Sequence, residues 1–334
     1  MPDRIDGNTA GRDSGISLIR FIALVMIISC HFCQYYELEI AWWLNAGVQI
    51  FLCISGYLYG RRNVGDVMSF YGRRFKKILL PYYFVIAVFI ISMLAFKGGV
   101  PVTDIGKMVI MSGTVSGGGH LWFVPTILFC YVLTPLLEKG FSIPFVKNRL
   151  SFAAVTLFSM LVAALFCMGF AEGYDQTCLV CYIIGYALGL NSVKRYFKET
   201  TLTPFFALLA LMNGIQIYFD YVKHLELSDS LSQLYDLWAR YNHVWLGVFL
   251  FLFLKLIFSD VGRGGKFLSL ADSFSYETYL VHQFFILGPF SLLKVIKDPL
   301  AAVPAALLCI VLAAVLLKYL IRAFELLFKK KAKG

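Results

Sequence analysis

The stretch SLIRFIALVMIISCHF, residues 17–32, decides how the rest of the chain is interpreted. It contains one permanently charged side chain, Arg20, and one titratable ring near its end, His31. With the flanking residues it forms an apolar run over about residues 16–36. At 1.5 Å per residue, a helix of this length crosses the roughly 30 Å hydrocarbon layer of a bilayer. The run therefore predicts a transmembrane helix.

The same pattern recurs along the 334 residues. Hydrophobic residues make up 59% of the chain and charged residues only 15%, whereas soluble domains are typically about 25% charged. We expect an all-α, polytopic membrane protein with about ten transmembrane helices. The Gly-rich segment 100–118 is expected to be a surface or re-entrant loop. The predicted spans are 16–36, 42–60, 76–96, 120–138, 151–170, 176–191, 203–219, 241–259, 274–293 and 300–323.

The distribution of basic residues predicts the orientation. If the N-terminus is cytoplasmic, 22 of the 30 lysines and arginines fall in inner loops and six in outer loops, while Arg20 and Lys318 lie within spans. Basic residues are retained on the cytoplasmic side of membranes, so both termini are expected inside. The predicted organisation is a cytoplasmic segment 1–15, a transmembrane domain 16–323 and a basic cytoplasmic tail 324–334.

Two function classes are excluded by composition. The net charge of +10 is explained by topology, and we expect no nucleic-acid binding because no soluble domain carries a basic face. Six of the eight cysteines lie inside apolar runs, where cysteine acts as a small hydrophobe. The spacings Cys30–Cys33 and Cys178–Cys181 supply too few converging ligands for zinc, so no metal site is expected.

Arg20 and His31 are the candidate catalytic residues. Ionisable groups within a bilayer are costly and usually functional. Their spacing of eleven residues is three helical turns plus about 20°, so both side chains lie on one helix face. A neutral imidazole can accept a proton at physiological pH, which suits His31 to the role of general base. The structural alternatives are that Arg20 snorkels to the interface and that His31 is a packed, hydrogen-bonded core histidine.

A basic cluster lies between the second and third predicted spans and consists of Arg61, Arg62, Arg73, Arg74, Lys76 and Lys77. Guanidinium forks match phosphate geometry, so the cluster is a candidate phosphate-binding surface. The alternative is that it serves only to fix the topology.

Five motifs in order along the chain resemble the membrane acyltransferase-3 family. The first is the Arg-x10-His spacing of Arg20 and His31, and the second is NAGVQIFLCISGYLYGRR, residues 45–62. The third is YGRRFKKILLPYY, residues 71–83, in which lysine stands at position 77 where the family has arginine. The fourth and fifth are GHLWFVPTILFCYVLTPLL, residues 119–137, and FSYETYLVHQF, residues 274–284. Together the motifs span about residues 14–323.

The resemblance implies an O-acyltransferase that uses acyl-CoA, most often acetyl-CoA, as cosubstrate, with no bound cofactor. The expected acceptor is a hydroxyl of a cell-surface or lipid-linked glycan, and the expected location is the bacterial cytoplasmic membrane. Arg73, Arg74 and Lys77 are expected to bind the donor. Supporting roles are expected for His120, Trp122, Tyr276, Tyr279 and His282.

The residues are compatible with two mechanisms and with a second function. Direct attack by the acceptor with His31 as base and a covalent acyl-histidine are both compatible with the sequence. The alternative function is transport of a small anion or sugar, because transporters also carry intramembrane charges. The identity of the acceptor glycan is not encoded in these motifs.

Overall fold

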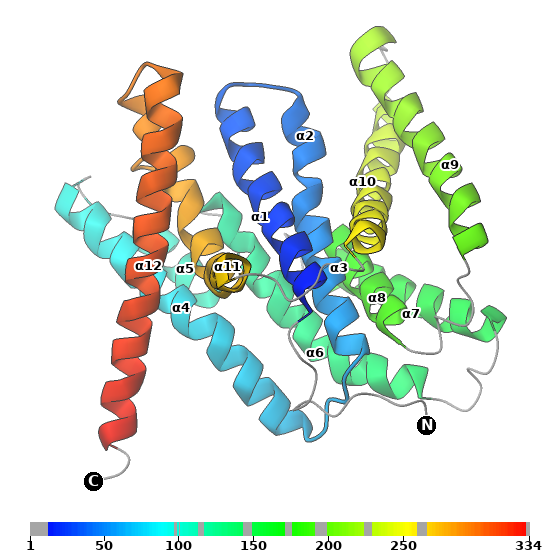
Figure 1. Cartoon of the computed structure of the whole chain (residues 1–334), viewed down its shortest axis with the longest axis horizontal. Coiled ribbons are helices and arrows are strands. Elements are labelled where there is room, and N and C mark those ends of the chain that lie inside the picture. Colours follow the sequence, from blue (N-terminus) through cyan, green and yellow to red (C-terminus); the bar gives the residue numbers. More distant parts are fainter. Residues whose placement is uncertain are drawn as a thin grey trace. The chain divides into compact units, whose positions relative to one another are not determined.

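The computed structural model describes residues 13–96, 99, 101–112, 117–142, 149–170, 176–190, 199–223, 229–258 and 266–331. Within these residues the regular structure is entirely helical (Figure 1). The bounds are α1 Ser14–Tyr35, α2 Ile40–Leu44, α3 Ala46–Gly60, α4 Val67–Phe96, α5 Val102–Ile110, η1 Gly119–Trp122, α6 Phe123–Phe141, α7 Arg149–Phe170, α8 Gln176–Gly189, α9 Glu199–Ile217, η3 Tyr218–Lys223, α10 Asp229–Ile257, α11 Lys266–Ile286, η4 Leu292–Lys294 and α12 Pro299–Lys331.

The all-helical prediction is confirmed for the described residues, and each of the ten predicted spans overlaps a helix. Among the residues that the structure describes, six segments are long and apolar enough to cross a membrane, and three shorter apolar helices accompany them. The long segments are Ser14–Tyr35, Ile40–Gly60, Val67–Phe96, Gly119–Phe141, Leu231–Ile257 and Pro299–Leu327. The chain is therefore a multi-pass membrane protein, while the count of ten and the cytoplasmic placement of both termini remain predictions.

Several boundaries differ from the sequence prediction. Helix α4 begins earlier than predicted, at Val67, α10 begins earlier, at Asp229, and α12 continues to Lys331. The span predicted at 274–293 is shifted, because α11 begins at Lys266 and ends at Ile286, just before Gly288 and Pro289. Segment 100–118, predicted as a loop, contains the nine-residue helix α5, which is too short to span a bilayer. The hydroxyl of Tyr82, on α4, donates to the carbonyl of Met108 at 2.7 Å and so holds α5 against α4.

Aspartates begin three of the long helices. The Asp13 carboxylate accepts from the N–H of Ile16, the Asp66 carboxylate from Ser69, and the Asp298 carboxylate from Leu300, at 3.2, 2.7 and 3.1 Å respectively. Each carboxylate satisfies a free N–H of the first turn and faces the positive end of the helix dipole. Hydrogen bonding to Ser69 lowers the pKa of the exposed Asp66 below its ordinary value.

The chain divides into two compact units. The first comprises Met1–Ala23, Asn45–Val64 and Leu133–Gly264, and the second comprises Leu24–Leu44, Gly65–Val132 and Gly265–Gly334. Two helices, α1 and α6, therefore contribute residues to both units.

Glycines hold the first unit together where α3 meets α8. A Cβ at Gly56 would lie 2.0 Å from the carbonyl oxygen of Tyr182, and one at Gly185 would lie 2.1 Å from that of Cys53. Gly60 and Gly189 show the same close approach. Gly56 and Gly60 on α3, and Gly185 and Gly189 on α8, each have small-xxx-small spacing, which lets the backbones of membrane helices touch.

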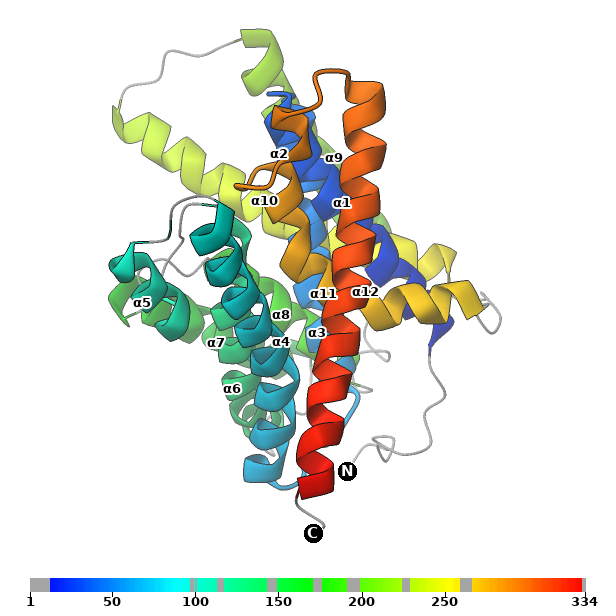
Figure 2. The ribbon, with the colours of Figure 1, turned by 90° about the vertical axis from the view of Figure 1, so that its left-hand side faces the viewer.

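A bent helix of the second unit, α11, packs against α12 and α4. Figure 2 shows that its first turns run in a different direction from the part that follows. The hydroxyl of Ser273 donates to the carbonyl of Leu270, and that of Ser275 to the carbonyl of Asp272, at 2.7 and 2.9 Å. Serine hydroxyls that bond back to the preceding turn bend helices, so the sequence Ser-Phe-Ser explains the change of direction.

Candidate active site

Three histidine rings from three elements of the second unit lie next to one another. The ring centroid of His31, on α1, is 5.0 Å from that of His282, on α11. The centroid of His120, in η1, is 5.1 Å from that of His282. His282 is fully buried and His120 nearly so, while His31 is half-buried. The structure thus joins the predicted general base to two residues for which only a supporting role was expected.

Backbone carbonyls fix the tautomers of the two buried rings. Nε2 of His120 lies 2.8 Å from the carbonyl oxygen of Leu280, and Nδ1 of His282 lies 2.6 Å from that of Tyr279. A carbonyl can only accept, so each of these nitrogens carries the ring hydrogen. In the neutral ring the other nitrogen, Nδ1 of His120 and Nε2 of His282, then holds an acceptor lone pair.

His31 is oriented by its own helix. Its Nδ1 lies 2.6 Å from Oε1 of Gln34, one turn further along α1. With the amide oxygen accepting, Nδ1 carries the hydrogen and Nε2 holds the lone pair. This is the arrangement that a histidine base requires, because the partner on one nitrogen selects the nitrogen that reacts.

Tyr279 and Gln283 join η1 to α11 around the rings. The Tyr279 hydroxyl donates to the carbonyl of His120 at 2.5 Å, and the backbone N–H of His120 donates to Oε1 of Gln283 at 2.5 Å. Sequence reasoning missed Gln283 and Gln34. Their only signal is proximity, since Gln283 follows His282 directly and Gln34 lies one turn after His31.

The other supporting candidates make different contacts. The Tyr276 hydroxyl donates to the carbonyl of Ile78 at 3.0 Å and so ties α11 to α4. The ring centroid of Trp122 lies 6.3 Å from that of its neighbour Phe123. These contacts give Tyr276 a structural role in addition to any role in the reaction.

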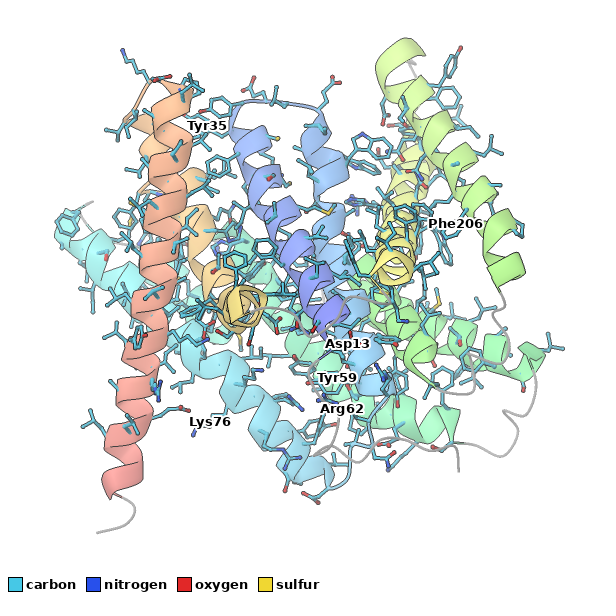
Figure 3. The ribbon with its side chains drawn as sticks, viewed as in Figure 1. Asp13, Tyr35, Tyr59, Arg62, Lys76 and Phe206 are labelled. Carbon is cyan, nitrogen blue, oxygen red and sulfur yellow. The ribbon has the colours of Figure 1, made fainter. Side chains whose placement is uncertain are left out.

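Arg20 lies eleven residues before His31 on the same helix. This separation corresponds to about 16.5 Å along the helix axis, so the two side chains do not form one contact site. Arg20 is half-buried. Figure 3 marks Asp13 and Tyr35 near the two ends of α1, and Arg20 is nearer to the Asp13 end.

The three predicted donor-binding residues, Arg73, Arg74 and Lys77, share one region of α4. Arg73 and Lys77 are exposed and one turn apart, while Arg74 is half-buried with its guanidinium carbon 5.7 Å from the centre of the Phe70 ring. Residues three and four apart are neighbours on a helix surface, so Lys77 adjoins both arginines. Its neighbour Lys76 is paired instead with Glu325 of α12, at 3.7 Å.

The two earlier arginines of the basic cluster belong to the first unit. Arg61 lies 3.6 Å from the carboxylate of Asp13, and its guanidinium carbon lies 5.5 Å from the centre of the Tyr57 ring. Nζ of Lys255 lies 5.3 Å from the centre of the same ring. In Figure 3, Asp13, Tyr59 and Arg62 mark this region.

Comparison with known protein families assigns this chain to a family. A family profile described as an acyltransferase domain matches residues 13–322. Searches of curated proteins and of solved structures gave no match. The matched range contains the three-histidine site and all five sequence motifs. Because the match covers nearly the whole chain, this membrane protein belongs to the acyltransferase 3 family.

Proposed function

We propose that the protein transfers an acetyl group from cytoplasmic acetyl-CoA to a hydroxyl of a cell-surface or lipid-linked glycan. The family supports acyl transfer in general, and the apolar helices support action within a membrane. The five motifs support the donor, the O-linked product and the bacterial cytoplasmic membrane as the location.

The observation that carries the proposal is the contact of 2.6 Å between Nδ1 of His31 and Oε1 of Gln34. With Nδ1 donating to Gln34, the lone pair of Nε2 is available to take a proton from an attacking hydroxyl. General-base catalysis of this kind typically contributes 10²–10⁴-fold in rate. No comparable observation favours transport of a small solute.

In the proposed reaction, His31 takes the proton of the acceptor hydroxyl and later delivers it to the leaving sulfur. The acceptor oxygen attacks the thioester carbonyl carbon, and its proton moves to Nε2 of His31. The tetrahedral intermediate collapses, so that the C–O bond remains and the C–S bond breaks. The proton passes from His31 to the departing sulfur, which leaves as CoA thiol, and His31 returns to its neutral form.

The remaining candidates serve the donor. CoA is cytoplasmic and carries several negative charges, so its phosphates suit Arg73, Arg74 and Lys77, which lie on the cytoplasmic side in the predicted orientation. Arg20 lies on the cytoplasmic side of His31 in that orientation, where it can guide the donor or stabilise negative charge. Binding at the inner surface would allow the acetyl group to cross the membrane without CoA.

The test compares His31→Gln with His31→Ala in purified protein, using radiolabelled acetyl-CoA and glycan-containing membranes from cells lacking the gene. Both variants should lose transfer by 10²-fold or more while CoA binding is retained, because the base acts on the acceptor. His243→Gln provides the control, since His243 is a buried histidine of α10 in the other unit. Near-normal transfer by His31→Gln would rule out the base.

A further inference from the structure

We propose that His120 and His282 form an acceptor subsite that binds neutral hydroxyl groups of the glycan beside the one being acylated. The proposal rests on the acyl transfer proposed above and assigns the two buried rings to substrate recognition. It predicts a polyol substrate, in which one hydroxyl faces His31 while its neighbours face the other two rings.

The first observation is that two buried acceptor atoms lack partners. In the part of the chain that the structure describes, Nδ1 of His120 and Nε2 of His282 have no hydrogen-bond partner. The exposed fraction is 2% for His120 and 0% for His282. A buried polar atom without a partner costs roughly 1–3 kcal/mol. Since most such atoms are satisfied in native proteins, two in adjacent rings indicate that a ligand occupies the site during function.

The second observation concerns the kind of ligand. Both rings are held so that the hydrogen of each points to a backbone carbonyl, and the lone pairs that remain can only accept. A ligand must therefore supply hydrogens, as a hydroxyl does. Among the described residues, the two rings contact carbonyls, aromatic rings and His31, and the backbone N–H of His120 contacts Gln283; none of these contacts is with a carboxylate. This setting favours a neutral donor over an ammonium group.

The third observation is the position of the rings. The His282 centroid is 5.0 Å from that of His31 and 5.1 Å from that of His120. One small ligand can contact neighbouring rings at such separations. The base must lie within hydrogen-bond reach of the hydroxyl that it activates, so a glycan bound at His31 places its adjacent hydroxyls near His282. The amide N–H groups of the pantetheine arm of CoA have the same donor chemistry and are the competing source.

Asn and Gln substitutions separate ligand binding from a structural role. The amide of Asn reaches the position of Nδ1, and that of Gln reaches the position of Nε2. His282→Asn and His120→Gln can therefore keep the bond to the carbonyl through the NH₂ group but lose the open acceptor. His282→Gln and His120→Asn lose that bond but can place an amide oxygen at the open acceptor.

The experiment measures radiolabelled acetyl transfer by the four purified full-length variants, with the apparent KM determined separately for acetyl-CoA and for the membrane glycan. We expect His282→Asn and His120→Gln to raise the glycan KM about tenfold, the usual effect of one lost hydrogen bond, with the acetyl-CoA KM unchanged. The reciprocal variants should lie nearer to wild type. The opposite ranking would show a purely structural role, and a rise in the acetyl-CoA KM alone would assign the lone pairs to pantetheine. Both outcomes overturn the proposal.

A second measurement does not need turnover. In ¹⁵N-histidine-labelled protein, the acceptor nitrogens of His120 and His282 should shift when the solubilised glycan is added, and they should not shift when CoA is added. Failure of the wild type to transfer acetyl would count against the proposed function, whereas the absence of this shift in an active enzyme would count against the hydroxyl subsite.

Discussion

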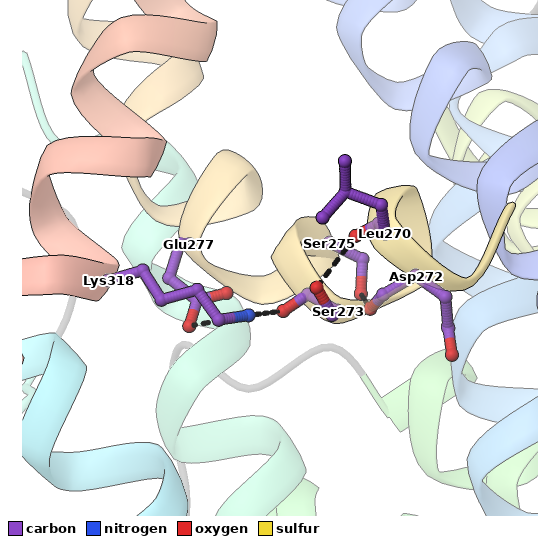
Figure 4. A network of polar contacts seen from close by, with 6 residues as sticks. All are labelled: Leu270, Asp272, Ser273, Ser275, Glu277 and Lys318. Carbon is purple, nitrogen blue, oxygen red and sulfur yellow. Dashed lines mark hydrogen bonds and ion pairs between the residues drawn. The ribbon is translucent and has the colours of Figure 1, made fainter. Parts of the chain in front are cut away.

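Nζ of Lys318, on α12, lies 3.8 Å from a carboxylate oxygen of Glu277, on α11. The same ammonium donates to the carbonyl of Ser273 and lies 4.2 Å from the centre of the Phe274 ring. Figure 4 shows the contacts of Lys318 with Glu277 and Ser273 at the bend of α11. A charge pair in a membrane helix bundle thus fastens α12 to the helix that carries Tyr279 and His282.

Breaking this pair should destabilise the protein. Lys318→Met leaves the largely buried Glu277 carboxylate without its cation, which we expect to lower the free energy of unfolding by up to about 3 kcal/mol. Thermal unfolding in one detergent measures the loss. The double variant Lys318→Met/Glu277→Gln removes both charges and should recover most of it. A double variant as unstable as the single one would show that Lys318 acts through Ser273 and not through Glu277.

The glycine contact between α3 and α8 should tolerate no side chain. Gly185→Ala would place a methyl group 2.1 Å from the Cys53 carbonyl oxygen, so the two backbones must separate. Overpacking of this kind typically costs about 1–3 kcal/mol. Gly214→Ala in α9 is the matched control, because its Cβ would meet nothing within 4 Å. That change should be neutral or stabilise by roughly 0.5–1 kcal/mol. Equal thermal stability of both variants would contradict the tight contact.

The basic face of α4 should determine donor affinity. Arg73→Ala and Arg74→Ala should each raise the acetyl-CoA KM about tenfold or more, because hydrogen bonds to charged groups contribute roughly 1.5–3 kcal/mol. Added salt should weaken binding in the wild type more than in the variants. Arg322→Ala, which removes an exposed arginine of α12, controls for net charge. An acetyl-CoA KM that stays constant in both α4 variants would leave this face with a topological role only.

Replacing Lys77 with arginine should strengthen donor binding. Lysine binds phosphate as a point charge, while arginine offers a bidentate fork. The Lys77→Arg variant is therefore expected to lower the acetyl-CoA KM without changing the glycan KM. A rise in the acetyl-CoA KM would mean that position 77 needs the more compact ammonium.

The predicted orientation can be tested by cysteine labelling on intact cells. A cysteine at position 230 should react with a membrane-impermeant reagent, and one at position 329 should react only after lysis. The background should lack Cys33 and Cys309, which are half-buried. Reaction of position 329 from outside would reverse the model of both termini in the cytoplasm.

The helices could be predicted from the sequence because their cause is local. A run such as residues 17–32 specifies both a length and an apolar environment, and each predicted span overlaps a helix. Boundaries were less predictable. The start of α11 at Lys266 could not be predicted because the first turns of the helix are only mildly apolar. Its end at Ile286 depends on Gly288 and Pro289.

The grouping of the three histidines was beyond sequence reasoning. His31, His120 and His282 are separated by 89 and 162 residues, and only the packing of η1 and α11 brings their rings together. The tautomers were equally hidden, since they depend on which carbonyl faces which nitrogen. Lys318 could be recognised as a charge within a span, but its partner Glu277 could not.

The carbonyls that hold His120 and His282 belong to the main chain of α11, so the protonation pattern of the site does not depend on which side chain stands at position 280. Leu280 can be exchanged for another apolar residue of similar volume without altering the carbonyl that orients His120. The selectivity of the proposed acceptor subsite could then be redesigned by repacking around the rings, while the helix backbone keeps the tautomers of the rings unchanged.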